Sequence, residues 1–107
     1  MKMTDNQKLF DTLKDLTGEA VGVSDNLIKS LRSFDINVAM NDFIKLSIVV
    51  EEIVNLIYLE ETLRPYIYDI NSVLKNMLEA IENKDYYLVS DIVEYELLPN
   101  LNKLTQN

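Results

Sequence analysis

Apolar side chains recur at alternating steps of four and three residues through most of this chain. From Leu9 to Leu27 the steps are 4, 3, 4, 3 and 4, which is the spacing of one face of an α-helix. A capping-box pattern beginning at Thr4 precedes this run. Because the phase passes unbroken through two glycines, we expect one long helix over about residues 5–33. A break at Ser24 is the alternative.

Two further helices follow from the same spacing. Residues 38–59 carry an apolar stripe so wide that little polar face remains, so we expect this helix to lie centrally and to be buried on more than one side. Proline breaks a helix interior, so Pro65 predicts a turn near residues 60–62, with Thr62 as a cap. A third helix then runs to Glu82. One long kinked rod in place of the second and third helices is the alternative.

A last helix follows a short connection. Asn83 is expected to take a left-handed conformation there, and Asp85 is expected to cap the final helix. Pro99 then ends or kinks that helix, and Leu101 and Leu104 indicate one more packed turn.

Short connections between helices impose antiparallel neighbours. The 107 residues include only two glycines and two prolines, which leaves few turns and favours a few long elements. We therefore predict an all-α fold, an up-and-down antiparallel four-helix bundle with a long first helix, forming a single domain over residues 1–107.

One internal similarity suggests a repeat. Residues 42–51 and 85–94 share Asp, an aromatic residue, Ser, Val and Glu at matching positions. The offset of 43 residues is near the length of a helix-pair repeat. Duplication is one interpretation, and convergence of two core-facing helices is the other.

Charge and missing residue types exclude several functions. The net charge of −8 disfavours binding to nucleic acid and to anionic membranes. The chain has neither cysteine nor histidine, so thiolate chemistry, cysteine-based zinc sites and histidine-based catalysis are excluded. Its two glycines lie inside a helical pattern and form no phosphate loop. We predict a non-enzyme without cofactor or metal.

Carboxylate pairs are the remaining candidates for a cation. These pairs are Glu51/Glu52, Glu60/Glu61 and Asp91/Glu94, and solvated acidic faces are the other interpretation of them.

The same sequence bears on localisation. The most apolar window, residues 43–59, contains charged side chains that disfavour membrane insertion. The polar N-terminus lacks an apolar signal core. We expect a cytoplasmic protein.

The segment from Asp85 to Pro99 interleaves tyrosines, carboxylates and aliphatic residues. Aromatic side chains rimmed by charge are typical of protein-docking surfaces, and packing at the edge of the core is the structural alternative. We single out Tyr86, Asp91, Glu94 and Tyr95 as candidate partner-binding residues.

This segment resembles a C-terminal pattern in small, uncharacterised helical proteins of Gram-positive bacteria. The resemblance rests on Asp85-Tyr86-Tyr87-Leu88-Val89, Asp91-Ile92, Glu94-Tyr95-Glu96-Leu97 and Pro99. It covers about fifteen residues and implies a helical bundle, with no established activity.

The functional prediction is a non-catalytic interaction or adaptor module that binds a protein partner or itself. It rests on the surplus of apolar helix face and on the tyrosine-rich acidic segment. The alternatives are a bundle of the kind that chaperones secretion or flagellar subunits, similar only in size and layout, and a bundle that binds a small ligand or a cation.

Overall fold

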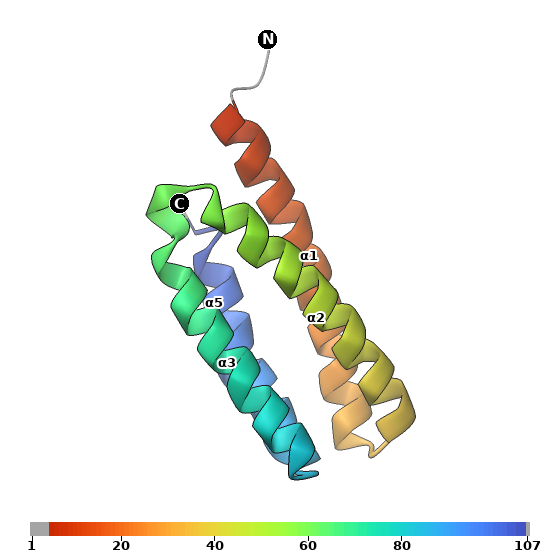
Figure 1. Ribbon diagram of the computed structural model, residues 1–107. Coiled ribbons are helices and arrows are strands. Elements are labelled where there is room, and N and C mark those ends of the chain that lie inside the picture. Colours follow the sequence, from red (N-terminus) through yellow and green to blue (C-terminus); the bar gives the residue numbers. More distant parts are fainter. Residues whose placement is uncertain (1–4, 107) are drawn as a thin grey trace.

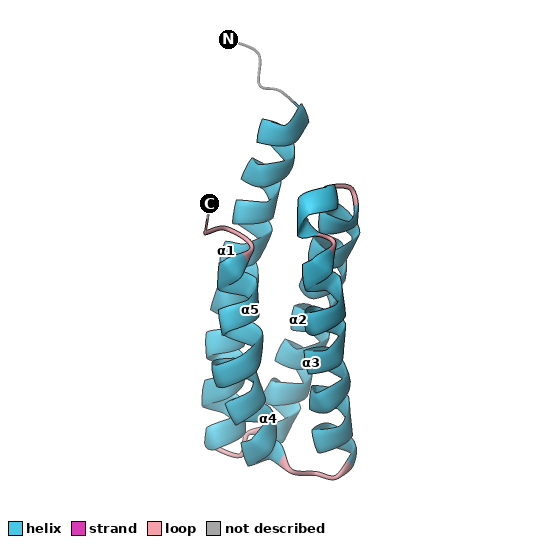
Figure 2. Cartoon of the chain, turned by 90° about the vertical axis from the view of Figure 1, so that its left-hand side faces the viewer, coloured by secondary structure: helices cyan, strands magenta, loops and turns pink. Residues whose placement is uncertain are grey.

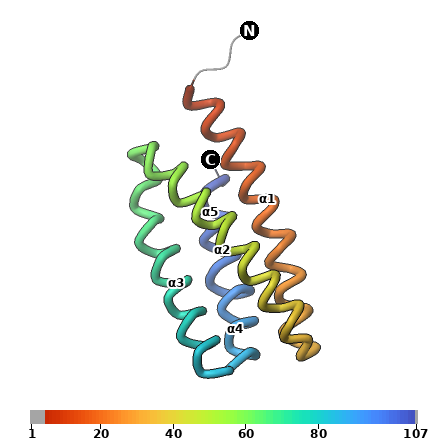
Figure 3. Tube along the Cα trace, turned by 45° about the vertical axis from the view of Figure 1, so that its right-hand side comes forward, coloured from red at the N-terminus to blue at the C-terminus, as the bar shows by residue number. Residues whose placement is uncertain are grey.

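The computed structural model describes residues 5–106, which are helical apart from short turns (Figure 1). Successive helices run antiparallel (Figure 3), and the bundle has extents of 49 × 24 × 19 Å. The predicted all-α four-helix bundle with a long first helix is confirmed. The helices are α1 (Asp5–Arg32), α2 (Ile36–Tyr58), α3 (Pro65–Glu82) and a fourth rod composed of α4 (Tyr86–Ile92), the π-helical turn η2 (Val93–Leu97) and α5 (Leu98–Lys103).

Helix α1 is continuous over 28 residues. Gly18 and Gly22 lie on its exposed side, where a Cβ atom would meet no neighbouring atom. Leu13 and Leu27, on the opposite side, are fully buried. Packing of that side outweighs the cost of about 1 kcal/mol for each helical glycine. The alternative of a break at Ser24 is wrong, since this residue is buried within the helix.

The first turns of α1 extend past the ends of the other helices (Figures 1 and 2). Leu9 and Phe10 in this extension are half-buried, whereas Leu13, one turn further on, is fully buried. Thr4, the predicted start of the capping box, lies outside the described residues. The bundle therefore begins to enclose α1 at about its third turn.

Buried aliphatic side chains from all four rods form one core cluster. Leu27, Ile53, Ile70 and Leu97, one from each rod, are fully buried. Full burial of a side chain of this size contributes about 1.5–3 kcal/mol. The alternating steps of three and four that predicted the helices are thus the steps between core contacts.

Helix α2 does not lie centrally, and this prediction is wrong. Ile44 and Ile48 on its outer side are 58% and 54% exposed. The wide apolar stripe belongs to a helix whose inner side completes the core while part of its outer side stays uncovered.

Two left-handed residues end α1 and α3. Phe34 has φ 58° and Lys84 has φ 57°. In both turns the amide of the following residue donates to the carbonyl five residues back, at 2.9 Å. This is the Schellman arrangement, which satisfies carbonyl groups left free at a helix C-terminus.

The prediction that Asn83 is the left-handed residue is wrong, because its φ is −84° and Lys84 takes that position. A left-handed Asn83 would have required α3 to end one residue earlier than it does. The predicted cap at Asp85 is confirmed, since its carboxylate accepts the Leu88 N–H at 3.2 Å. Asp35 occupies the same place before α2, but its side chain makes no capping hydrogen bond.

A short 3-10 turn, η1 (Glu61–Leu63), separates α2 from α3. Pro65 stands at the start of α3, where its missing N–H would have had no intrahelical acceptor. Thr62 is not the cap that we predicted: the carboxylate of Glu60 accepts the Thr62 N–H at 3.4 Å. The two helices are separate, and the single kinked rod is wrong.

The side chain of Arg64 stabilises this turn through two contacts with Tyr58. Its Nε donates to the Tyr58 carbonyl at 2.7 Å, and its guanidinium lies 5.1 Å from the centre of the Tyr58 ring. The hydrogen bond and the cation–π contact join the end of α2 to the start of α3.

The last helix continues through Pro99, so the prediction that this residue could end the helix is wrong. The buried residues Val89, Val93, Leu97 and Leu101 follow one another at steps of four. In a regular α-helix three such steps drift by about 120° around the axis. The wide turn over η2, in which the Leu98 N–H donates to the Val93 carbonyl, compensates for this drift.

The internal similarity of residues 42–51 to residues 85–94 differs in structure at its first position. Asp42 lies buried in the second turn of α2, whereas Asp85 is exposed and caps α4. The core positions match, since Leu46/Val89, Val49/Ile92 and Val50/Val93 are all buried. This shared burial fits two core-facing helices, whether the pattern arose by convergence or by duplication.

Candidate functional site

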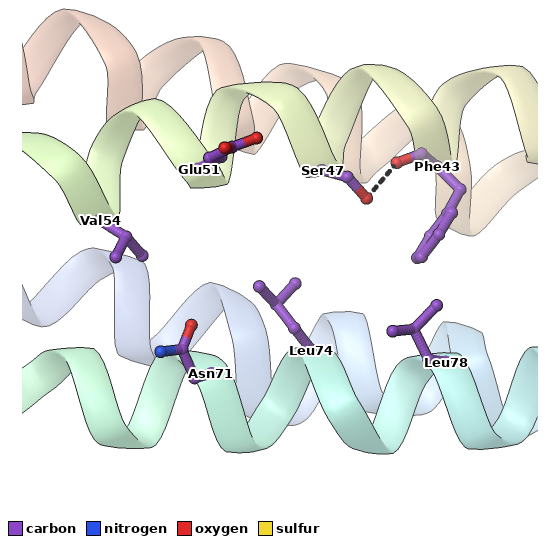
Figure 4. A pocket seen from close by; sticks show the side chains of 7 residues that line it. All are labelled: Phe43, Ser47, Glu51, Val54, Asn71, Leu74 and Leu78. Carbon is purple, nitrogen blue, oxygen red and sulfur yellow. Dashed lines mark hydrogen bonds between the residues drawn. The ribbon is translucent and has the colours of Figure 1, made fainter.

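An apolar groove lies between α2 and α3. It has a volume of about 280 Å³. Phe43 and Val54 point into it from α2, and Leu74 and Leu78 point toward them from α3 (Figure 4). The complete lining consists of Phe43, Ser47, Glu51, Val54, Asn71, Leu74 and Leu78.

The groove exists because its walls carry short or polar side chains where a tight seam needs large apolar ones. Ser47 sits midway along the α2 wall, and its hydroxyl donates to the Phe43 carbonyl at 2.9 Å (Figure 4). The hydroxyl is therefore turned onto its own helix and does not reach α3. Asn71 on the opposite wall adds a polar group. Neither residue fills the space that a leucine would fill.

Apolar surface continues from the groove onto the outer side of α2. Ile44 and Ile48 each follow a lining residue by one position, which places them about 100° further round the helix. Both are more than half exposed, and Leu78 on the other wall is 49% exposed. A contiguous apolar strip of this kind is typical of an interaction site.

The opposite seam, between α1 and the last helix, is bridged by charge at the C-terminal end of α1. Near its other end it holds a cavity of about 340 Å³, lined by Phe10, Asp11, Lys14, Leu104 and Thr105. The Arg32 guanidinium donates to Glu94 Oε2 at 2.6 Å and to Asp91 Oδ1 at 3.4 Å. The Arg32 and Glu94 side chains remain 34% and 36% exposed. The hydrogen bond from Arg32 is the main cause that lowers the pKa of Glu94.

The four residues singled out in the sequence are therefore not one free surface. The structure brings Asp91 and Glu94 together around Arg32, so both carboxylates contact the chain itself. Tyr86 is half-buried and packs against the core. Tyr95 is 69% exposed. A partner-binding role for this segment stays a prediction.

The groove was not predicted as a site. Its signal in the sequence was the surplus of apolar residues in α2. We interpreted the stripe of α2 as burial, and we used the apolar surplus of the chain to predict an interaction module without placing the surface. Ile44 and Ile48 belong to that surplus and mark exposed apolar surface instead. Periodicity within one helix does not show how far away the next helix lies.

The carboxylate pairs do not join into larger acidic clusters in the described part of the chain. Within residues 5–106, no three acidic side chains converge in a way that could hold an ion. Glu60 caps the 3-10 turn, and Asp91 and Glu94 are held by Arg32.

A membrane span is also missing from this part of the chain. Among the helices of residues 5–106, none combines the length and the apolar character needed to cross a bilayer.

Fold and groove together define a small acidic four-helix bundle with an open apolar groove between its second and third helices. The chain belongs to the family described as a domain of unknown function, DUF8042, whose family model matches residues 8–107. No curated protein and no solved structure matches the chain significantly.

Proposed function

We propose that this chain is a non-catalytic interaction module that binds a protein partner in the α2–α3 groove. The observation that carries the proposal is the apolar strip formed by the groove and by Ile44 and Ile48 beside it. Burial of exposed apolar area of this kind against a partner lowers the free energy, because it removes that area from water. The cavity between α1 and the end of the last helix is lined by both Asp11 and Lys14, so it is less apolar than the α2–α3 groove.

The shape of the groove supports a protein partner over a small ligand. Pockets for small molecules usually measure 300–1,000 Å³ and enclose most of the ligand. At about 280 Å³ and only partly enclosed, this groove suits a few side chains of a larger molecule. A cation-binding role has no candidate site within residues 5–106.

A chaperone-like role is compatible with the same groove, since such bundles hold a segment of a client protein. A cytoplasmic site of action remains a prediction from the acidic composition. Tyr95 is a second candidate surface, because it is exposed and lies on the last helix, away from the groove.

The experiment compares three forms of the protein as bait in a lysate of the source organism. In the groove variant, Ile48→Gln and Leu78→Gln replace two apolar side chains that are about half exposed. In the control variant, Tyr87→Gln and Leu88→Gln replace two of similar exposure on α4. All three forms have the same net charge.

We expect one protein, retained by the wild type and by the control variant, to be lost from the groove variant. Light scattering on the wild type shows at the same time whether the retained species is a second copy. A wild type that is strictly monomeric and retains nothing would overturn the proposal, and so would equal retention by all three forms.

A further inference from the structure

The two walls of the groove define the shape of what can fill it. Lining residues on α2 span positions 43–54 at steps of 4, 4 and 3, and those on α3 span positions 71–78 at steps of 3 and 4. At 1.5 Å per residue, the groove therefore runs for about 16 Å along α2 and about 10 Å along α3. An occupant about three helical turns long would match the longer wall.

The backbone chemistry of the walls favours a helical occupant over an extended one. Both walls are interior turns of α-helices, whose N–H and C=O groups bond within their own helix. An extended peptide would find no backbone partners there, and its own polar groups would lose water without compensation. A helix satisfies its backbone internally and presents only side chains.

The charge around the groove favours an occupant with a positive charge. Residues 36–82, which contain both walls, carry eight acidic and three basic side chains. One of the eight, Asp42, is buried and accepts a hydrogen bond from Ser30 on α1, which leaves seven acidic side chains outside the core. Glu51 lines the groove, and its seven lining residues include no Lys or Arg. A second copy of the chain would bring the same negative excess, and like charges across an interface disfavour association.

We propose that the α2–α3 groove receives an amphipathic helix of a partner protein, about three turns long, with Lys or Arg flanking its apolar side. The apolar side fills the space between Phe43 and Leu78, and the basic flanks meet the acidic surface of α2 and α3. This inference rests on the proposed function and adds the chemistry of the partner.

The test uses three fluorescent 15-residue peptides. The first has leucines at helical spacing flanked by lysines, the second has the same leucines flanked by glutamates, and the third is the lysine peptide with its leucines scrambled. Fluorescence anisotropy measures the Kd of each for the wild type, the Ile48→Gln/Leu78→Gln variant and the Tyr87→Gln/Leu88→Gln control. Circular dichroism confirms that all three proteins are folded.

We expect the lysine peptide to bind the wild type and the control at least tenfold more tightly than the groove variant. The glutamate and scrambled peptides should bind the wild type at least tenfold more weakly than the lysine peptide. Because all three proteins have equal net charge, this contrast separates groove binding from general attraction to an acidic surface.

Equal affinity of the lysine peptide for the wild type and the groove variant would overturn the inference, as would equal affinity of the wild type for lysine and glutamate peptides. If the lysate protein still depends on Ile48 and Leu78 in that case, the proposed function stands and only the helix chemistry fails. If the lysate protein is also independent of them, both fail.

Discussion

Arg32 at the end of α1 donates a hydrogen bond to Glu94 in the π-helical turn at 2.6 Å, across 62 positions of sequence. With the weaker contact to Asp91, this ion pair bridges the seam between the first and last helices at the C-terminal end of α1. Among the described residues, no ion pair spans the seam between α2 and α3, which holds the apolar groove. The two seams therefore differ, one being bridged by charge near its end and the other being lined mainly by apolar side chains.

The Glu94 ion pair predicts a specific dependence of stability on pH. The pKa of Glu94 is lowered in the folded state, chiefly by the hydrogen bond from Arg32. Its contribution is therefore present above the unfolded-state pKa of about 4.3 and lost as the pH falls through the folded-state value. Urea unfolding midpoints between pH 6 and pH 2 should fall more steeply for the wild type than for Glu94→Gln.

Glu96→Gln is the matched control, because Glu96 is exposed and lies on the same turn. This variant should keep the wild-type pH slope. Identical slopes for the wild type and Glu94→Gln would show that the ion pair adds nothing to stability.

The glycines of α1 predict two stabilising substitutions. Gly18 and Gly22 are helical and exposed, and a Cβ at either position meets no atom within 4 Å. Alanine should therefore raise the free energy of unfolding by about 0.5–1 kcal/mol at each site. Leu13→Ala, which opens a cavity on the buried side, should cost about 2–5 kcal/mol. Chemical denaturation measures all three, and a destabilising Gly18→Ala would contradict the exposed placement.

The two left-handed turns predict a gain from glycine. A non-glycine residue in this conformation costs on the order of 1 kcal/mol, and Phe34 is also 67% exposed, so little packing offsets the strain. Phe34→Gly and Lys84→Gly should each stabilise the protein by up to about 1 kcal/mol in thermal or urea unfolding. Val38→Gly, in the first turn of α2, is the control and should destabilise it.

The π-helical turn predicts that one residue can be removed from the last helix. The turn holds one residue more than an α-helical turn, so deleting Glu96 and replacing Pro99 by alanine should restore a regular helix with the same buried positions. We expect this variant to unfold cooperatively within a few degrees of the wild-type Tm. Deleting Asp25 from α1 instead would rotate every following core residue by about 100°, and should abolish cooperative unfolding. If both deletions behave alike, the phase argument fails.

Local periodicity accounts for what the sequence could predict. The seam of α1, the turn at Pro65 and the cap at Asp85 follow from residues a few positions apart, and the structure agrees with each. The steps of four from Val89 to Leu101 contain the signal for the π-helical turn, which we interpreted only as an end or kink at Pro99. Short-range patterns thus determine elements well.

Contacts and distances between different helices could not be predicted from the sequence, for a physical reason. The Arg32–Glu94 pair joins residues that only the folded topology brings together, so Asp91 and Glu94 were interpreted as a free docking face. The groove depends on the distance between α2 and α3, which is set by how both helices pack on the rest of the bundle. Ile44 and Ile48 give the same apolar pattern in the sequence whether the fold buries them or leaves them exposed.

Site-specific photocrosslinking in the source organism tests the central claim, that a protein partner occupies the α2–α3 groove, most directly. A photoreactive amino acid is placed at Leu78, which lines the groove, or at Tyr95, which is exposed on the last helix. The account predicts that the Leu78 position crosslinks one defined protein, and that Ile48→Gln in the same chain reduces this product at least several-fold. A defined product from Tyr95 alone, or none from either position, would contradict it.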